Sequence, residues 1–188
     1  MAHPEEDDRI YWYAPDPRAI LPIEDFHVPR RLEQTVSKEP FEICINRDFD
    51  AVIKECAAPR KTQKQTWISS GLAAVYSELH HLGFVHTVEA WEGDELVGGL
   101  YGVAIGGLFA GESMFHRRTD ASKICLVHLV RRLEERGFML LDIQFITDHL
   151  AQFGAVEIPR EEYEDLLAEA LELPCTFVDD DDRCTDDA

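Results

Sequence analysis

The stretch that decides the fold is residues 86–146, which read HTVEAWEGDELVGGLYGVAIGGLFAGESMFHRRTDASKICLVHLVRRLEERGFMLLDIQFI. Three strand-like runs open it, at residues 86–91, 95–105 and 108–115. The Gly-containing segments between these runs favour tight reversals. We therefore expect an antiparallel meander of three strands.

A helix and a further strand follow the meander. From Thr119 or Asp120 through Arg136, leucines recur at helical spacing, and Gly137 is placed to end the helix. Residues 138–146 are then apolar apart from Asp142 and Gln144, which predicts a strand that is covered on both faces. Meander, helix and strand in this order predict an α+β domain.

The flanking segments predict shorter elements around this domain. Residues 9–40 hold five prolines, which favour extended pieces and turns over long helices. The further elements that we expect are a strand at 41–45 and helices at about 48–58, 70–82, 147–153 and 160–171. We predict a reduced N-terminal lobe at residues 1–62, the main domain at 63–175, and an acidic, disordered tail at 176–188.

Charge and composition exclude several classes of protein. The net charge is −19, and residues 157–188 alone carry thirteen acidic and two basic side chains. Such a chain repels nucleic acid, so we expect no DNA partner, and any RNA contact must use local basic patches at residues 54–64 and 113–136. The longest uncharged run, residues 96–111, is shorter than a bilayer span of about 20 residues, and the acidic start resembles no export signal, so we expect a cytoplasmic protein without a membrane partner.

Two acidic positions in apolar runs are candidates for chemistry. Asp142 and Gln144 lie two residues apart, so their side chains point to the same face of a strand. A hydrogen bond from the Gln144 amide or a nearby cation would favour the ionised carboxylate. Glu112 falls on one predicted face with Leu108, Ala110 and Met114. The structural alternatives are a satisfied buried pair for Asp142 and Gln144, and a partner of a core arginine for Glu112.

Aromatic and histidine side chains give weaker signals. Trp67 and Tyr76 follow the basic residues Arg60, Lys61 and Lys64 and would suit stacking on a base, although core packing is the commoner role at helical spacing. Three histidines, His80, His81 and His86, lack a carboxylate or cysteine at a usual ligand spacing. The five cysteines form no C-x-x-C pair. We therefore expect no metal.

Together these segments resemble the leucyl/phenylalanyl-tRNA-protein transferase family. The runs that carry the resemblance are YWYAPDPR (11–18), TWI (66–68), YSELH (76–80), HTVEAW (86–91), LVGGLYGV (96–103), GESMF (111–115), ASK (121–123) and DIQ (142–144). The resemblance implies a mixed sheet with flanking helices, like that of the GNAT acetyltransferases. It also implies transfer of Leu, Phe or Met from charged tRNA to the N-terminal α-amino group of an acceptor protein, without a cofactor, which marks the acceptor for proteolysis.

The resemblance also assigns roles to individual residues. Asp142 is expected to polarise Gln144, Gln144 to assist the attacking amine, and Glu112 to act as a polar anchor. The residues expected to line the aminoacyl pocket are Leu100, Phe109, Met114 and Leu141. The residues expected to contact tRNA are Trp67 and Tyr76 at the terminal adenosine and Arg117, Arg118 and Lys123 at phosphates.

Some features depart from the family pattern and leave alternatives open. The chain does not show the Gly- and aromatic-rich N-terminal stretch of typical members, His116 stands where Ser is usual, and Ile143 replaces a common Cys. The resemblance implies an acceptor that begins with Arg or Lys, which an acidic surface would attract, and the departures keep Asp or Glu open as the alternative. A catalytically silent adaptor that binds degrons or tRNA is a rival interpretation. An acetyl-CoA-dependent acetyltransferase is a weaker one, because residues 115–122 contain no glycine to cradle a pyrophosphate.

Overall fold

A seven-stranded mixed sheet forms the centre of the molecule in the computed structural model, which describes residues 2–4, 10–59 and 66–179. Its strand order is β4-β5-β6-β7-β8-β3-β9, and β7 and β8 run parallel whereas the other neighbours are antiparallel. The strands are β3 (Arg18–Ile20), β4 (Glu42–Ile45), β5 (Val85–Glu92), β6 (Glu95–Ile105), β7 (Leu108–His116), β8 (Leu140–Gln144) and β9 (Val156–Ile158). A separate pair is formed by β1 (Ala2–Pro4) and β2 (Ile10–Trp12).

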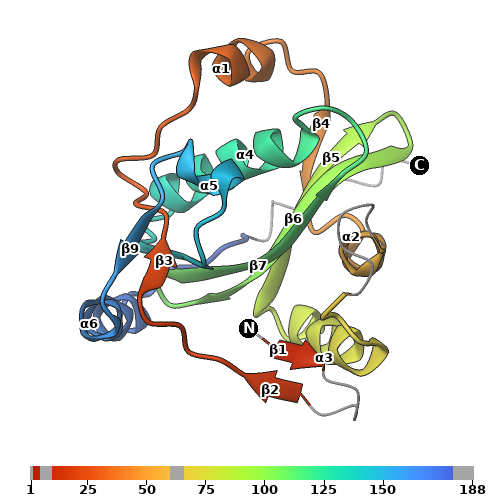
Figure 1. Ribbon diagram of the computed structural model, residues 1–188. Coiled ribbons are helices and arrows are strands. Elements are labelled where there is room, and N and C mark those ends of the chain that lie inside the picture. The colour runs from red at the N-terminus through yellow and green to blue at the C-terminus, as the bar shows by residue number, and fades with distance from the viewer. Residues whose placement is uncertain (1, 5–9, 60–65, 180–188) are drawn as a thin grey trace.

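Helices cover both faces of this sheet (Figure 1). They are α1 (Arg30–Val36), α2 (Phe49–Ala57), α3 (Ser70–His81), α4 (Ala121–Glu135), α5 (Asp148–Ala151) and α6 (Arg160–Leu171). The long helix α4 packs on one face, where it forms the largest core cluster. On the other face, α2 and α3 share a second cluster and α6 a third. The predicted meander and the predicted α+β mixed sheet are confirmed.

Local sequence signals set most of the helix ends. The side chain of Ser69 accepts a hydrogen bond from the Leu72 N–H, and Asp48 caps α2 in the same way at Ala51. After α3, Gly83 adopts a φ of 81°, which a residue with a side chain rarely tolerates. Helix α4 differs, because Asp120 at its start has a φ of 62° and makes no capping bond with its side chain.

The N-terminal segment that we expected to form a separate lobe belongs largely to this same body. Within residues 1–62, strands β3 and β4 pair into the central sheet, and α2 packs into its core. At the other end, the tail that we predicted to start at residue 176 begins with a packed side chain: Phe177 is 3% exposed and lies against Phe109 and His86. The packed chain thus extends beyond the boundary predicted at residue 175, while residues 180–188 lie outside the described chain.

A β-bulge in β7 separates it from β8. The register passes from Gly102 opposite Gly111 to Tyr101 opposite Ser113, so Glu112 is the extra residue. Pairing between β7 and β8 stops at Ala110 opposite Asp142, just before the bulge. The two parallel strands therefore diverge from this point, and a gap opens between them.

The bulge also corrects one expectation. Alternation predicted that Leu108, Ala110, Glu112 and Met114 share one face, but Leu108 packs in the cluster under α6 and Met114 in the cluster under α4. The extra residue shifts the alternation by one, which moves every later side chain to the opposite face.

In the described part of the chain, no helix is long and apolar enough to cross a membrane.

Candidate active site

A cavity of about 280 Å³ occupies the gap between β7 and β8. Its apolar wall comes from both strands, from β6 and from α4, and it includes Leu100, Met114, Leu126, Leu129 and Leu141. Polar side chains, among them Glu112 and Gln144, complete the lining. A cavity of this size accommodates one amino-acid side chain.

Glu112 projects from the bulge into this gap. It is partly buried and lines the cavity, and the Tyr76 hydroxyl on α3 hydrogen bonds with it. Burial raises the pKa of the Glu112 carboxyl, Asp142 adds to this rise, and Tyr76 and Arg18 act against it. A carboxylate with a raised pKa is a better hydrogen-bond and proton acceptor near neutral pH than an exposed glutamate.

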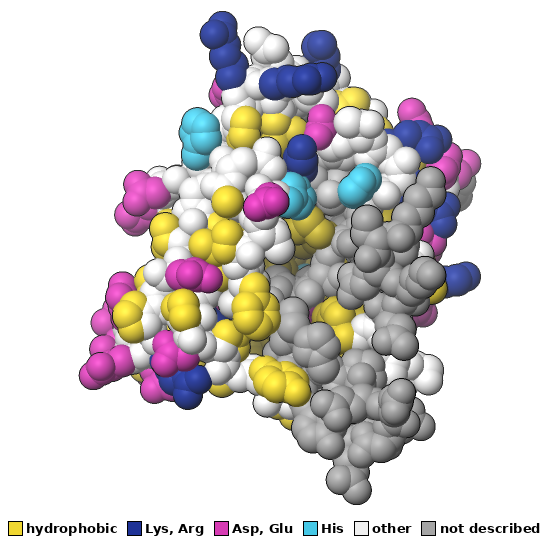
Figure 2. All heavy atoms as spheres, viewed as in Figure 1, with side chains coloured by type: hydrophobic (Ala, Val, Ile, Leu, Met, Phe, Trp, Pro, Cys, Tyr) yellow, Lys and Arg dark blue, Asp and Glu magenta, His cyan; other side chains and the backbone are white. Residues whose placement is uncertain are grey.

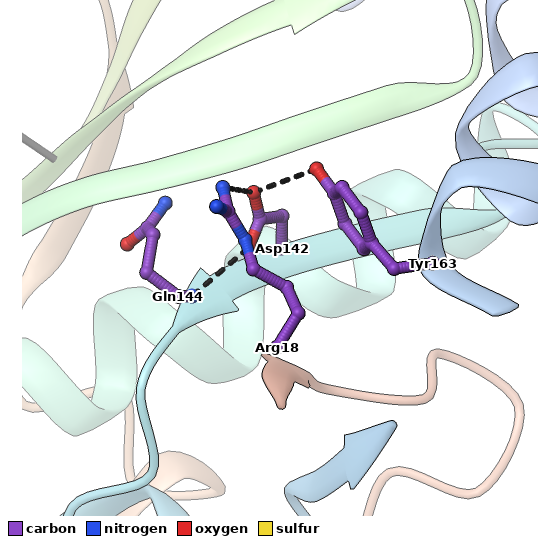
Figure 3. Close-up of polar contacts among 4 residues, drawn as sticks. All are labelled: Arg18, Asp142, Gln144 and Tyr163. Carbon is purple, nitrogen blue, oxygen red and sulfur yellow. Dashed lines mark hydrogen bonds and ion pairs between the residues drawn. The ribbon is translucent and has the colours of Figure 1, made fainter. Parts of the chain in front are cut away.

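Asp142 lies beside the cavity in a dense network of hydrogen bonds (Figure 3). Its carboxylate is 1% exposed. Arg18 on β3 donates to it from Nε at 3.0 Å and from Nη2 at 2.5 Å, and the Tyr163 hydroxyl on α6 donates at 3.0 Å. The arginine thus provides the nearby cation that the sequence left as one alternative.

Gln144 ends β8 in an unusual backbone conformation. Its φ is 61°, in the left-handed region that residues other than glycine avoid. Its backbone N–H donates to Asp142 Oδ1 at 2.9 Å, and its side chain points to the same side of β8 as Asp142 (Figure 3). Within the described chain, Asp142 reaches Gln144 through this backbone group and not through the amide side chain. The expected polarisation of the Gln144 side chain by Asp142 therefore has no direct contact to support it.

Three of the four expected pocket residues line the cavity, namely Leu100, Met114 and Leu141. Phe109 does not. It is fully buried in the core, and its ring centroid lies 5.1 Å from that of Phe177. Phe109 lies in the part of β7 that still pairs with β8, opposite Leu141, so the gap between the two strands has not yet opened at its position.

The aromatic residues expected near the adenosine gather on the α3 side of the gap. The ring of Trp67 packs edge-on against Tyr76 at 6.5 Å, and Tyr76 reaches Glu112. Tyr76 itself is buried, so its contacts fit the core role that we kept as the alternative. The preceding basic residues Arg60, Lys61 and Lys64 lie outside the described residues.

The three cations expected at phosphates are engaged in ion pairs with carboxylates. Arg117 pairs with Glu55, and Lys123 pairs with Asp120 at 3.1 Å. Arg118 bridges two acids of the β5–β6 hairpin, Glu92 and Glu95, each at 3.0 Å. These side chains are at least partly exposed, so such pairs contribute little stability and can exchange partners.

The histidines have local partners. His80 Nδ1 hydrogen bonds with the Val85 carbonyl at 2.8 Å and His81 Nδ1 with the Ser77 carbonyl at 2.7 Å. His86 is held by Asn46 and by the Gly83 carbonyl. Across the described residues, no group of three or more His, Cys, Asp and Glu side chains could hold a metal ion.

Two residues of the network were not found by the sequence reasoning. Arg18 ends the run of residues 11–18 that carried the resemblance, yet nothing local indicates that it pairs with a residue 124 positions away. Tyr163 lies on the packed face of the acidic helix α6 together with Leu166 and Leu167, so its sequence position suggests only a packing role. Only the pairing of β3 with β8 and the packing of α6 bring both onto Asp142.

Comparison with known proteins identifies the family. A family model described as leucyl/phenylalanyl-tRNA protein transferase matches residues 20–168. The chain belongs to this family. It is 54% identical over 177 residues to the leucyl/phenylalanyl-tRNA–protein transferase of Phenylobacterium zucineum, covering 94% of this chain and 80% of that one. It is 52% identical over 171 residues to the enzyme of the same name from Paramagnetospirillum magneticum, covering 91% and 82%.

The protein is therefore an aminoacyltransferase that uses leucyl- or phenylalanyl-tRNA, and neither rival interpretation, the silent adaptor or the acetyltransferase, is needed. Among solved structures, L-PGS from Bacillus licheniformis aligns with a TM-score of 0.52 at 10% identity, covering 83% of this chain and 65% of that one. At this identity the likeness concerns the fold alone, and it agrees with the predicted mixed α+β sheet.

Proposed function

We propose that the cavity between β7 and β8 holds the leucyl or phenylalanyl side chain of the charged tRNA, and also accepts a methionyl side chain. The observation that carries this proposal is the lining itself: flexible apolar side chains form much of the wall, and Glu112 and Gln144 are among the polar side chains that complete it. Leucine and methionine side chains adapt to unbranched, branched and aromatic groups of similar size. The volume suits one side chain, with the ester at the polar end.

The reaction at this end joins the acceptor amine to the aminoacyl group. The α-amino nitrogen of the acceptor attacks the ester carbonyl carbon, a C–N bond forms, and the bond to the tRNA 3′ oxygen breaks. The nitrogen loses a proton, and the departing oxygen gains one. In our proposal Glu112 binds the incoming amine and accepts a hydrogen bond from it, while the side-chain amide of Gln144 orients the amine. The ester is already activated, so alignment supplies much of the catalysis.

The tRNA end would approach from the α3 side. Trp67 would stack on the terminal adenosine beside Tyr76, because both residues gather near Glu112. Arg117, Arg118 and Lys123 would contact phosphates after exchanging their present carboxylate partners. Each such exchange replaces one exposed ion pair by another and so costs little.

We further propose that the acceptor begins with Arg or Lys, and that the added residue marks it for proteolysis in the cytoplasm. The net charge of −19 favours basic N-termini, and acidic side chains gather over α6 on the face shown in Figure 2. Acceptors that begin with Asp or Glu are the second candidate. The preference for the acceptor's N-terminal residue depends on the side chains of the enzyme close to the reacting amine and not on the overall charge alone.

The test is transfer of radiolabelled Leu or Phe from charged tRNA to peptides that begin with Arg, Lys, Asp, Glu or Ala. We expect label on the Arg and Lys peptides. Label on the Asp and Glu peptides instead would keep the site and refute the acceptor assignment. Label on none of them, with charged tRNA bound, would refute the proposed reaction at this site.

Glu112→Gln tests the anchor directly. Gln keeps the size but removes the charge that binds the amine, so we expect kcat/KM for the acceptor peptide to fall by about 100-fold while binding of charged tRNA stays unchanged. The measurement is steady-state transfer at saturating charged tRNA. An unchanged kcat/KM would remove Glu112 from the proposal.

A further inference from the structure

The Asp142 carboxylate is saturated with hydrogen bonds. Oδ1 accepts from Arg18 Nε at 3.0 Å and from the Gln144 N–H at 2.9 Å. Oδ2 accepts from Arg18 Nη2 at 2.5 Å and from the Tyr163 hydroxyl at 3.0 Å. Four donors, two of them from the Arg18 guanidinium, leave this buried group no lone pair with which to take a proton from a substrate amine.

Arg18 and Tyr163, the two side chains that donate to Asp142, are both held in their protonated forms. Burial acts against the charge of Arg18, but the hydrogen bond and the charge of Asp142 raise the pKa of its guanidinium. Burial and the neighbouring carboxylate raise the pKa of the Tyr163 phenol. The guanidinium also lies 4.8 Å from the centre of the Tyr163 ring, so the two donors support each other as well as Asp142.

Gln144 depends on this arrangement more than the other residues of the cavity. Its left-handed φ of 61° is unfavourable for a residue with a side chain, and surrounding contacts must maintain it. The hydrogen bond from its N–H to Asp142 Oδ1 is the side-chain contact that helps to do so, beside the Phe145 N–H bond to the Ile143 carbonyl at 2.7 Å and the pairing of Gln144 with Ala19 on β3. If the carboxylate rotated away, the Gln144 N–H would lose its acceptor, and the turn that aims Gln144 at the cavity would be less firmly held.

We propose that Arg18 and Tyr163 are positioning residues that lock the Asp142 carboxylate so that it captures the Gln144 N–H and aims the Gln144 side chain at the reacting ester. Asp142 then works through the backbone of Gln144 and takes no proton. The inference rests on the proposed role of Gln144. Because Arg18 comes from β3 and Tyr163 from α6, the reactive end of the cavity is complete only when both ends of the chain have packed onto β8 (Figure 1).

The test measures whether these residues act through Gln144. Arg18→Met and Tyr163→Phe are made in the wild-type and in the Gln144→Ala background. Transfer of Phe to an Arg peptide is measured as a single-turnover rate at saturating charged tRNA, and as a steady-state rate over a range of charged tRNA concentrations that gives KM. We expect Arg18→Met to slow transfer by about tenfold and Tyr163→Phe by about threefold, with KM for charged tRNA unchanged. In the Gln144→Ala background, neither substitution should slow transfer further.

Arg160→Met is the matched control, because Arg160 also anchors the N-terminal segment, through the Ala14 carbonyl at 2.6 Å, but does not contact Asp142. It should keep the wild-type rate. If Arg18→Met does not fold, Tyr163→Phe, which removes one hydroxyl, carries the test alone.

An equal loss of rate in both backgrounds would overturn the inference, because it would show an action independent of Gln144. A change in KM alone would overturn it as well. A wild-type rate for Gln144→Ala itself would instead refute the proposed role of Gln144, so the two failures are distinguishable.

Discussion

His86 should make the stability of the transferase depend on pH in a defined window. The imidazole is 4% exposed. Its Nδ1 lies 3.0 Å from the Asn46 amide nitrogen and its Nε2 lies 3.1 Å from the Gly83 carbonyl. These partners fit a neutral ring with the proton on Nε2, because Nδ1 faces a donor. Burial, together with His80 and Arg132, lowers the pKa of His86 from 6.5 to about 4 although the Gly83 carbonyl acts in the opposite direction.

The size of the effect follows from linkage. Between pH 6.5 and about 4 the unfolded chain binds a proton at His86 and the folded protein does not. The contribution is therefore fully present above pH 6.5 and is lost as the pH falls toward 4. At about 1.4 kcal/mol for each pKa unit, the loss amounts to about 3 kcal/mol.

The assay is urea unfolding of wild type and His86→Leu at several pH values between 7 and 4. The variant should be less stable at pH 7, because Asn46 loses its acceptor, but its curve should be flatter than that of wild type by about 3 kcal/mol over the window. The exposed His27→Leu is the control and should follow wild type. Parallel curves for wild type and His86→Leu would refute the reasoning.

Two further predictions concern close packing and buried polar groups. Gly102→Ala would place its Cβ 2.3 Å from the Phe109 ring, so urea unfolding should show a loss of about 3 kcal/mol in the free energy of unfolding. Gly111→Ala, whose Cβ would have its nearest contact at 3.7 Å, should lose less than about 1 kcal/mol. Equal losses in the two variants would contradict this. Glu89→Leu removes the acceptor of the Trp91 indole N–H, the Thr87 hydroxyl and the Asp48 N–H, the first two of them buried. It should therefore lower the free energy of unfolding by about 3 kcal/mol or more, and Glu89→Gln should lower it by clearly less. Equal stability of the two variants would contradict this.

Capping residues and hydrophobic spacing were sufficient to predict the helices α3 and α4 from the sequence. Ser69 and Gly83 delimit α3 as their capping chemistry suggests, and leucine spacing predicted α4. Strands β3 and β9 were missed because each has three residues and exists through pairing with distant segments. No local period distinguishes such a segment from a loop.

The site was predicted in part for the same reason. Alternation correctly placed Asp142 and Gln144 on one side of a strand. It failed across the bulge at Glu112, which turns Met114 to the face opposite Leu108, and Gly111 beside the bulge was the only local hint of an irregularity. Arg18 could not be predicted as the partner of Asp142, because that contact follows from the order of strands in the sheet and not from the residues nearby.

The most direct test of the central claim is to fill the cavity. Met114 lines it and is only partly buried, so Met114→Trp should occupy the space of the aminoacyl side chain without unfolding the protein, and Met139→Trp, at a site 37% exposed outside the lining, is the control. Transfer of Phe from charged tRNA to an Arg peptide should fall by about 100-fold or more in Met114→Trp and stay at the wild-type rate in Met139→Trp. A folded Met114→Trp protein that transfers Phe at the wild-type rate would contradict the assignment of this cavity as the aminoacyl site.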